Sequence, residues 1–319
     1  MEGVHHKNLR LKIFSVLILG GLVIVILYFL KNRKSPEQIR EIERISAFKN
    51  IKPGANRAVL TLDNGVEMVL DSESIGPLAH QGNTTISKTA DDCLTYTVDN
   101  KGSSGVEFNT VSTPRGGRFR LVLPDSSRVW LNAASSINFP SAFSGTQRLV
   151  RITGEVYFEI VTKSNMPFVV KLKDQVVENL GTAFNIKAYP EEEVFITTPI
   201  HGAVKVFLDT NSVLLQPGQQ ELTYGQSIVK KNIVDLENAI AWHQGFFVFD
   251  GNSLKDIMGQ IGRWYNLEIR YDGSFSPEKY VGRINSQTSL SDVLAKLEKQ
   301  GLRFTLEGRL LHVWENTAR

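Results

Sequence analysis

The stretch TPRGGRFRLVLPDSSRVWLN, residues 113–132, gathers residue types that could do chemistry. It contains Asp125 followed by Ser126 and Ser127, together with four arginines. A nucleophilic serine needs a general base and donors that stabilise an oxyanion. An earlier stretch, LTLDNGVEMVLD (60–71), aligns with residues 121–132 without a gap, and it lacks any such group. Because Asp and Ser side chains also hydrogen-bond the backbone of tight turns, we interpret residues 125–127 as a turn between two strands.

The remaining reactive residues form no recognisable catalytic or metal-binding motif. The sequence has no HExxH, C-x-x-C, phosphate-loop or dinucleotide pattern. Glu155 and Glu159 lie on one predicted strand about 13 Å apart, too far for a glycosidase pair. The glutamates at 191–193 follow Tyr-Pro and are interpreted as a solvated turn, and Cys93 is the single cysteine. We therefore predict no enzyme, no cofactor and no metal site.

Charge and hydrophobicity divide the chain near residue 34. Six of the seven charged residues in the first 34 are basic, whereas the rest of the chain carries a net charge of −2. This balance gives no indication of nucleic-acid binding. With 319 residues and 42% hydrophobic content, the chain can bury one substantial core or two.

A membrane anchor is predicted at residues 13–30, which begin with Ile13 and end with Leu30. These 18 residues contain no charge, and as a helix they would extend about 27 Å, enough to cross the hydrocarbon core. A cleaved signal peptide would have a shorter apolar region and a small-residue cleavage site, whereas KNRKS follows here. The basic residues on the two sides balance, so the orientation stays open. A short helical stalk is expected to begin at Ser35-Pro36.

Most of residues 56–240 reads as strand. Short runs rich in Val, Ile, Phe and Thr alternate with Gly, Pro, Asn and Asp. Residues 60–71 and 121–132 repeat one unit, in which leucines at alternate positions lead into a turn. Gly154, Gly181, Gly202 and Gly218 recur between strand halves and suit tight corners of a wound or stacked β architecture.

Residues 241–319 change to a mixed pattern that also repeats. SLKDIMGQIGRWYNLEIRY (253–271) and SLSDVLAKLEKQGLRFTL (289–306) each predict a capped helix followed by a strand. A strand precedes each helix, at 246–250 and 280–284, and residues 309–315 form a closing strand. The sequence therefore predicts two βαβ repeats plus one strand.

Apolar side chains of this region are candidate partner-docking residues. Such a small mixed domain can present an open sheet edge to which a partner adds a strand. The alternative is that these side chains form the core of the small domain and its contact with the β region. The candidates are Phe246, Phe247, Phe249, Leu302, Phe304 and Leu306.

Several motifs in order carry a family resemblance. They are TPRGGRFRLVLPDSSRVWLNAASSINFP, RITGEVYFEI, PFVV, VENLGTAFNIKAYP, LQPGQQ and AWHQGFFVFDGNSLKDIMGQIGRWYNLEI. Over residues 57–314 the chain resembles the FecR family of anti-sigma factors, of the type common in Bacteroidetes. The C-terminal repeats are similar to the STN-type domain.

The resemblance implies a bacterial inner-membrane protein with its C-terminal bulk in the periplasm. It implies that the signalling domain of a TonB-dependent outer-membrane transporter contacts this part and thereby regulates an extracytoplasmic-function sigma factor. Family members place a helical sigma-binding segment before the anchor, whereas 12 residues precede the predicted span here. The resemblance therefore assigns sigma binding to no residue of this chain.

We accordingly expect a single-pass membrane protein with a mainly-β, stacked or solenoid-like periplasmic domain and a small α+β domain of two βαβ repeats. The expected parts are a cytoplasmic tail (1–12), a transmembrane helix (13–30), a juxtamembrane stalk (31–55), a FecR-like β domain (56–240) and an STN-like domain (241–319). The competing hypothesis is an anchored periplasmic ligand-binding or scaffold module without a transcriptional role.

Overall fold

A computed structural model describes residues 35–71, 73–90, 92–99, 106–232, 235–275 and 280–315. The chain divides into two compact units, Met1–Asn50 and Ile51–Arg319. The predicted membrane span, residues 13–30, lies outside the described residues. Within the described ranges, no helix combines the length and apolar character that crossing a bilayer requires.

The described part of the first unit is one helix, α2 (Pro36–Lys49). It begins at the predicted position, because Ser35 and Gln38 form a reciprocal capping box. The Ser35 hydroxyl accepts from the Gln38 N–H at 3.1 Å, and the Gln38 side chain accepts from the Ser35 N–H at 3.0 Å. Pro36 occupies the first turn, where its missing N–H costs no hydrogen bond.

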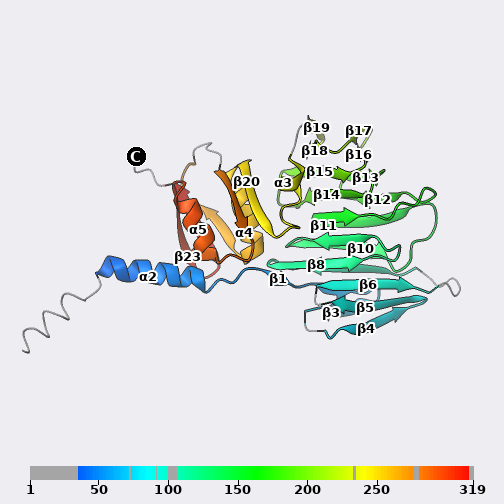
Figure 1. Ribbon diagram of the computed structural model, residues 1–319, viewed down its shortest axis with the longest axis horizontal. Helices are drawn as coiled ribbons and strands as arrows, with labels where there is room; N and C mark the ends of the chain where they lie inside the picture. Colours follow the sequence, from blue (N-terminus) through cyan, green and yellow to red (C-terminus); the bar gives the residue numbers. More distant parts are fainter. Residues whose placement is uncertain are drawn as a thin grey trace, which may run out of the picture. The chain divides into compact units, whose positions relative to one another are not determined.

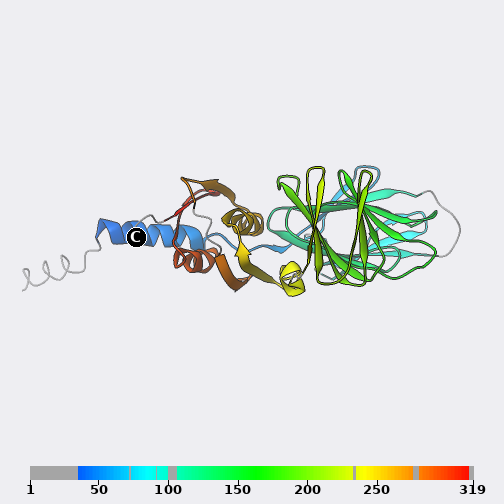
Figure 2. The ribbon, with the colours of Figure 1, turned by 90° about the horizontal axis from the view of Figure 1, so that it is seen from above.

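The second unit contains two layers of mostly antiparallel strands, which follow one another from β4 to β19 in Figure 1. Seen from above, the later strands lie over the earlier ones (Figure 2). One layer has the order β3 (Glu67–Val69), β2 (Val59–Thr61), β7 (Phe108–Thr113), β10 (Ser135–Pro140), β11 (Arg148–Glu159), β12 (Phe168–Lys171), β13 (Gln175–Asn179), β16 (Val204–Leu208) and β17 (Asn211–Leu215). The other has the order β4 (Gly76–Gln81), β5 (Thr84–Ala90), β6 (Cys93–Val98), β8 (Gly117–Val122), β9 (Arg128–Leu131), β11, β14 (Ala183–Ala188), β15 (Val194–His201), β18 (Gln219–Tyr224) and β19 (Ser227–Asn232). The short β1 (Ala55–Asn56) pairs in parallel with β8. We call this part the stack.

Strand β11 belongs to both layers. Its first half pairs with β10 and β12, and its second half pairs with β9 and β14. Gly154 lies at the change of layer with φ +83°, and a Cβ there would come within 2.6 Å of the Ser135 backbone. The corner predicted at this glycine therefore exists, and it requires glycine for both conformation and space.

The core of the stack follows the period of two that the sequence shows. Strands β8, β13 and β16 bury every second side chain, as expected when one face of each strand lies against the opposite layer. The core includes Leu60, Leu121, Val129, Ile137, Phe158 and Phe184. The prediction of a mainly-β fold is thus confirmed.

The duplicated hairpin unit is confirmed in its turns. Leu62 N–H donates to Val66 and Leu123 N–H donates to Ser127, each at the same offset within its copy. Gly65 has φ +81° and Ser126, at the equivalent position, has φ +72°. Ser126 thus occupies a left-handed turn position, which is the turn role predicted for it.

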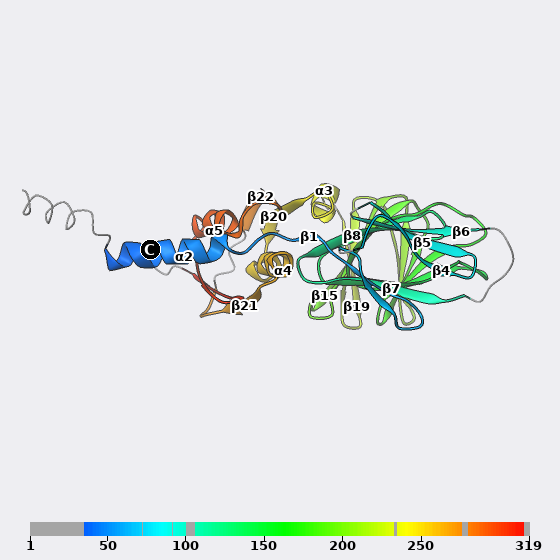
Figure 3. The same cartoon turned by 90° about the horizontal axis from the view of Figure 1, so that it is seen from below.

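The C-terminal elements form the module, defined here as residues 246–315 and drawn in Figure 3. Its order is β20 (Phe246–Asn252), α4 (Leu254–Tyr265), β21 (Glu268–Tyr271), β22 (Tyr280–Asn285), α5 (Leu290–Glu298), β23 (Leu302–Glu307) and β24 (Leu310–Glu315). Strands β20 and β22 form one antiparallel pair, and β21, β24 and β23 form a second sheet in that order. Both helices begin with the predicted Ser–Asp cap. A short helix, α3 (Leu236–Ala239), precedes the module.

Candidate functional site

The stack and the module meet along a contact that we call the seam, formed by residues 54 and 115–118 against residues 263–267. The Gly116 N–H donates to the Arg263 carbonyl at 2.7 Å, and the Arg115 guanidinium donates to the Leu267 carbonyl at 2.6 Å. A Cβ on Gly54 would lie 2.5 Å from the Trp264 ring. The seam is therefore close-packed, and its stack side consists largely of the Gly-Gly pair and arginines at residues 115–118.

Arg263 is the charged centre of the seam. Its guanidinium contacts Glu191 at 3.3 Å and Glu192 at 2.7 Å, and it lies 3.7 Å from the centre of the Tyr189 ring. Burial alone would lower the pKa of Arg263, but Tyr189 and Glu192 raise it above its ordinary value. Residues 191–193 form the predicted turn, with Glu191 and Glu193 exposed, but Glu192 is half-buried and pairs with both Arg263 and Lys187. The prediction of a solvated turn therefore fails only at Glu192.

The segment from α3 to residue 243 packs a second set of side chains against the stack, beside Tyr157, Ala183 and Ile200. Trp242 is buried and its indole N–H donates to Asn185 at 3.1 Å. His243 lies among rings, 4.7 Å from Trp130 and 4.6 Å from Tyr157 between ring centres. Burial lowers the pKa of His243, so this imidazole is neutral near pH 7.

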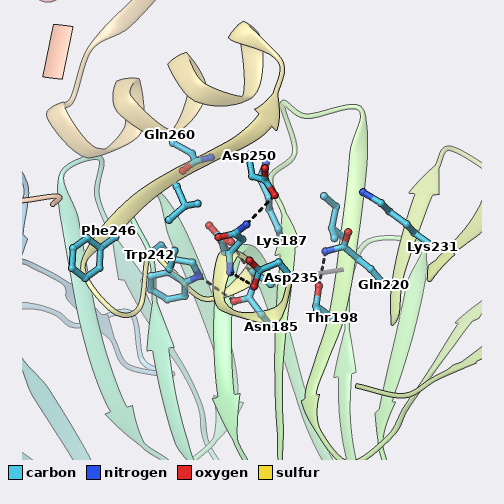
Figure 4. Close-up of a pocket in the computed structure, with 16 residues that line it drawn as sticks. Asn185, Lys187, Thr198, Gln220, Lys231, Asp235, Trp242, Phe246, Asp250 and Gln260 are labelled. Carbon is cyan, nitrogen blue, oxygen red and sulfur yellow. Dashed lines mark hydrogen bonds between the residues drawn. The ribbon is translucent and has the colours of Figure 1, made fainter. Parts of the chain in front are cut away.

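Beside this contact is a cavity of about 290 Å³, shown in Figure 4. Its floor is a row of facing residues on β14, β15, β18 and β19, namely Asn185, Thr198, Gln220 and Lys231. The Gln220 amide donates to the Thr198 hydroxyl at 2.8 Å. The opposite side includes Asp250, which accepts from the Asn238 amide at 3.3 Å.

Glu155 is a buried residue that also lines this cavity. Its two carboxyl oxygens accept from Asn132 at 2.8 Å and from Asn185 at 3.2 Å. Burial raises the pKa of Glu155 above its ordinary value despite these bonds and the nearby Lys187. Glu159 instead pairs with Arg128 at 2.6 Å outside the cavity. The cavity offers hydrogen-bonding groups, but its lining residues include no serine, cysteine or histidine that could act as a nucleophile.

The side chains of Asp125 and Ser127 form hydrogen bonds that hold the turn at residues 125–127 in place. Asp125 accepts from the Ser127 N–H at 3.0 Å, as Asn64 accepts from the Val66 N–H at 3.1 Å in the sister copy. Asp125 also forms a fully buried ion pair with Arg148, which the sequence did not reveal because the two residues lie on different hairpins.

Most of the candidate docking side chains lie in the interior of the module. Phe247, Phe249, Leu302 and Phe304 are each at most 2% exposed. Phe246 and Leu306 are half-buried. The four buried side chains therefore belong to the core, which was the alternative interpretation, and docking through them would require the module to open.

The strands that carry these residues do lie at sheet edges. Strand β23 is an outer strand of its sheet, and β20 and β22 form a sheet of two. The outward side of β22 is covered at one point by the Gln300 side chain, which accepts from the Val281 N–H at 3.4 Å and donates to the Val281 carbonyl at 3.5 Å. Val281 itself is 65% exposed. Val281 was not among the predicted docking residues, although an apolar residue next to Gly-Arg on a predicted strand was a usable signal.

Two family models match these parts of the chain. The FecR protein model matches residues 109–205, from β7 to the start of β16, and the model for the FecR C-terminal region matches residues 246–313, nearly the whole module. Together they cover just over half of the 319 residues. The chain belongs to the FecR family.

Solved structures agree with this FecR assignment. Two crystal structures, at 2.50 and 1.65 Å resolution, come from a candidate anti-sigma factor of Parabacteroides distasonis ATCC 8503. Each is 28% identical to this FecR protein with a TM-score of 0.61, and each match covers 65% of this chain and 98–99% of the other. No curated protein matches the chain.

Proposed function

We propose that this FecR protein is a membrane-anchored periplasmic regulator of an extracytoplasmic-function sigma factor. In this proposal residues 13–30 anchor it in the inner membrane, and the STN-like module receives the signalling domain of a TonB-dependent outer-membrane transporter. The family matches and the similarity to a candidate anti-sigma factor support regulation of a sigma factor. The domain limits expected from the sequence, 56–240 and 241–319, belong to the same proposal.

The open edge of β22 is the observation that carries the contact with a partner. Its outward backbone groups at Val281 are held by one side-chain amide at 3.4 and 3.5 Å, which is the long limit of a hydrogen bond. A partner strand would replace these two weak bonds with a regular ladder. Displacing Gln300 therefore costs little, and strand addition gains backbone hydrogen bonds along β22.

The test is capture of the signalling domain of a transporter encoded beside this gene by the full-length chain in detergent. Val281→Pro removes the outward N–H, whereas Val281→Ala keeps it and trims the exposed side chain. We expect Val281→Pro to weaken binding at least tenfold and Val281→Ala less than threefold. Capture no greater than that by empty resin would overturn the proposal, and equal binding by the proline variant would remove β22 from it.

The cavity of Figure 4 favours a second candidate function, an anchored ligand-binding or scaffold module without a transcriptional role. Its polar lining suits a small hydrophilic molecule. Deleting the gene distinguishes the two functions. An unchanged sigma-dependent reporter response to the transported substrate supports the scaffold, and a lost or constitutive response supports the regulator.

A further inference from the structure

A second groove, of about 330 Å³, lies where β8 of the stack faces the end of β22. Two arginines of β8, Arg118 and Arg120, line it together with Trp130, Trp242 and Trp264. We call it the arginine groove. It shares only Trp242 with the cavity of Figure 4.

Arg118 is a cation held by neutral groups. Its guanidinium lies 4.0 Å from the centre of the Trp264 ring, donates from Nε to Asn132 at 3.1 Å and donates from Nη1 to Ser286 at 3.4 Å. No carboxylate of the described residues lies within ion-pair distance of it. Burial lowers the pKa of Arg118 to about 10, so the side chain still carries its charge at neutral pH.

The acids near Arg118 leave this charge largely uncompensated. Glu155 attracts the guanidinium from a distance, but burial raises the pKa of Glu155 and two asparagine amides already bind its oxygens. Asp92 also lines the groove, but it pairs with Arg120 at 3.5 Å and not with Arg118. A half-buried charge that has hydrogen bonds but no counter-charge is costly, and the groove therefore favours an incoming anion.

Arg120 adds an unused donor to the same groove. Its Nε is buried and has no hydrogen-bond partner within the described part of the chain. Among the described residues that line the groove, the guanidiniums of Arg118 and Arg120 and the carboxylate of Asp92 leave one excess positive charge, which matches a monoanion. A phosphate dianion would carry more negative charge than this excess, and it would be repelled by the Asp92 carboxylate. Guanidinium groups and carboxylates also share a planar geometry, which allows two parallel hydrogen bonds between them.

The position of the groove points to a protein as the source of the carboxylate. Asn285 and Ser286, at the end of β22, line the groove. The outward edge of β22 at Val281 lies on the same strand, so a strand added there and extended toward residue 285 arrives at the groove. We propose that the arginine groove binds a carboxylate, either an aspartate or glutamate side chain or the C-terminal carboxylate, of the partner strand that adds to β22. The identity of the partner rests on the proposed function, whereas the carboxylate site does not.

The test is a titration of the full-length chain in detergent with small probes. N-acetylglutamate α-methylamide presents an isolated side-chain carboxylate, N-acetylglycine presents a terminal one, and N-acetylglutamine methylamide is the neutral control. Three of the four tryptophans line the groove, so intrinsic fluorescence reports binding. We expect a saturable change with a carboxylate and none with the amide, and the tighter carboxylate identifies the source.

Arg118→Gln should weaken this binding at least tenfold, because charge-assisted hydrogen bonds to a guanidinium are lost. Arg151→Gln is the matched control, since Arg151 is an exposed arginine of the stack that does not line the groove. The native Arg120 side chain is 36% exposed. Arg120→Gln is therefore a second variant to use if Arg118→Gln does not fold. No saturable response to either carboxylate, unchanged affinity in the folded variants, or tighter binding of inorganic phosphate would each overturn the proposal. Because no partner protein is present, this failure is distinct from failed capture of a signalling domain.

Discussion

Replacing Arg263 with glutamine should loosen the seam without unfolding either side of it. Arg263 is at most 6% exposed, and its side chain contacts Glu191, Glu192 and Tyr189 on the stack. Its own carbonyl accepts from the Gly116 N–H. Arg263→Gln keeps much of the volume and removes the charge, so the change isolates the electrostatic contribution to the seam.

The magnitude follows from the exposure of each partner. The contact with Glu192, whose side chain is 19% exposed, is a charged hydrogen bond of about 1.5–3 kcal/mol. The buried ring of Tyr189 adds about 1 kcal/mol through a cation–π contact. Glu191 is 57% exposed and contributes little. Because Lys187 still pairs with Glu192 at 2.6 Å, that carboxylate is not left alone. We therefore expect a loss of about 3 kcal/mol, which is roughly a hundredfold increase in the population with an open seam.

Hydrogen exchange of the full-length chain measures this opening directly. The Gly116 amide, bonded across the seam, should exchange roughly a hundredfold faster in Arg263→Gln, while amides in the centre of the stack keep their rates. Lys255→Gln is the control, because the Lys255–Glu193 pair is exposed on both sides, and it should leave the rate unchanged. An acceleration below threefold at Gly116 would refute the assignment of Arg263 as the centre of the seam.

Three further predictions concern the stack and the seam. Arg148→Met leaves a buried aspartate unpaired and should lower the free energy of unfolding by about 3–5 kcal/mol in urea titrations; a loss below 1 kcal/mol would contradict this. Burial raises the pKa of Glu221 above 4.5, so the folded state holds this proton more tightly than the unfolded chain. The stability that the neutral carboxyl provides is complete below pH 4.5 and is lost as the pH rises through the folded-state pKa; urea midpoints of Glu221→Gln should lack this decline, and parallel pH profiles would count against it. Gly54→Ala forces a Cβ into the Trp264 ring and should shift tryptophan emission and lower the melting temperature by several degrees, whereas Gly282→Ala, which has room for a Cβ, should not.

The repeated units were predictable because each is defined by local rules. In the hairpins, alternating leucines fix the buried face, and the turn residues adopt positions that their own side chains can bond. In the module, Ser253 and Ser289 cap helices whose apolar residues recur at helical spacing. Both signals lie within about fifteen residues of sequence. The elements of these regions therefore match the expectation closely. The two strands of each predicted βαβ repeat, however, lie in different sheets, because β20 pairs with β22 while β21 and β23 pair with β24.

Contacts between segments far apart in the chain could not be predicted from local sequence patterns. Residues 191–193 have the composition of a solvated loop, and only the placement of Arg263, some seventy residues later, brings Glu192 into a half-buried ion-pair network that the exposed Glu191 also joins. Arg118 likewise alternates with apolar residues on β8 and resembles an ordinary exposed strand residue. Its burial follows from Trp264 of the module, which no spacing in the stretch 113–132 indicates.

The docking candidates show a related limit. A period of two predicts correctly that Phe247 and Phe249 share a face, and the two rings stack with centres 6.5 Å apart. It does not say which face the helices cover, because both faces of β20 carry apolar residues. The ring of Phe247 lies 6.3 Å from Tyr265 of α4, so the helix covers this face, and the backbone edge rather than the aromatic face stays accessible.

The open edge of β22 and the arginine groove together provide a route by which a partner bound to the module would also contact the stack. Ser286 follows β22 directly, and its hydroxyl accepts from Arg118 of β8 while its carbonyl accepts from the Trp264 indole at 2.7 Å. Trp264 in turn packs against Gly54 and is adjacent to Arg263. A strand added to β22 would therefore fix the segment that holds both Arg118 and Trp264, and a carboxylate on Arg118 would tie β8 to the same partner. Because the two contacts lie on opposite sides of the seam, binding that uses both stabilises one arrangement of stack and module over others, which is the differential interaction that a relayed signal requires.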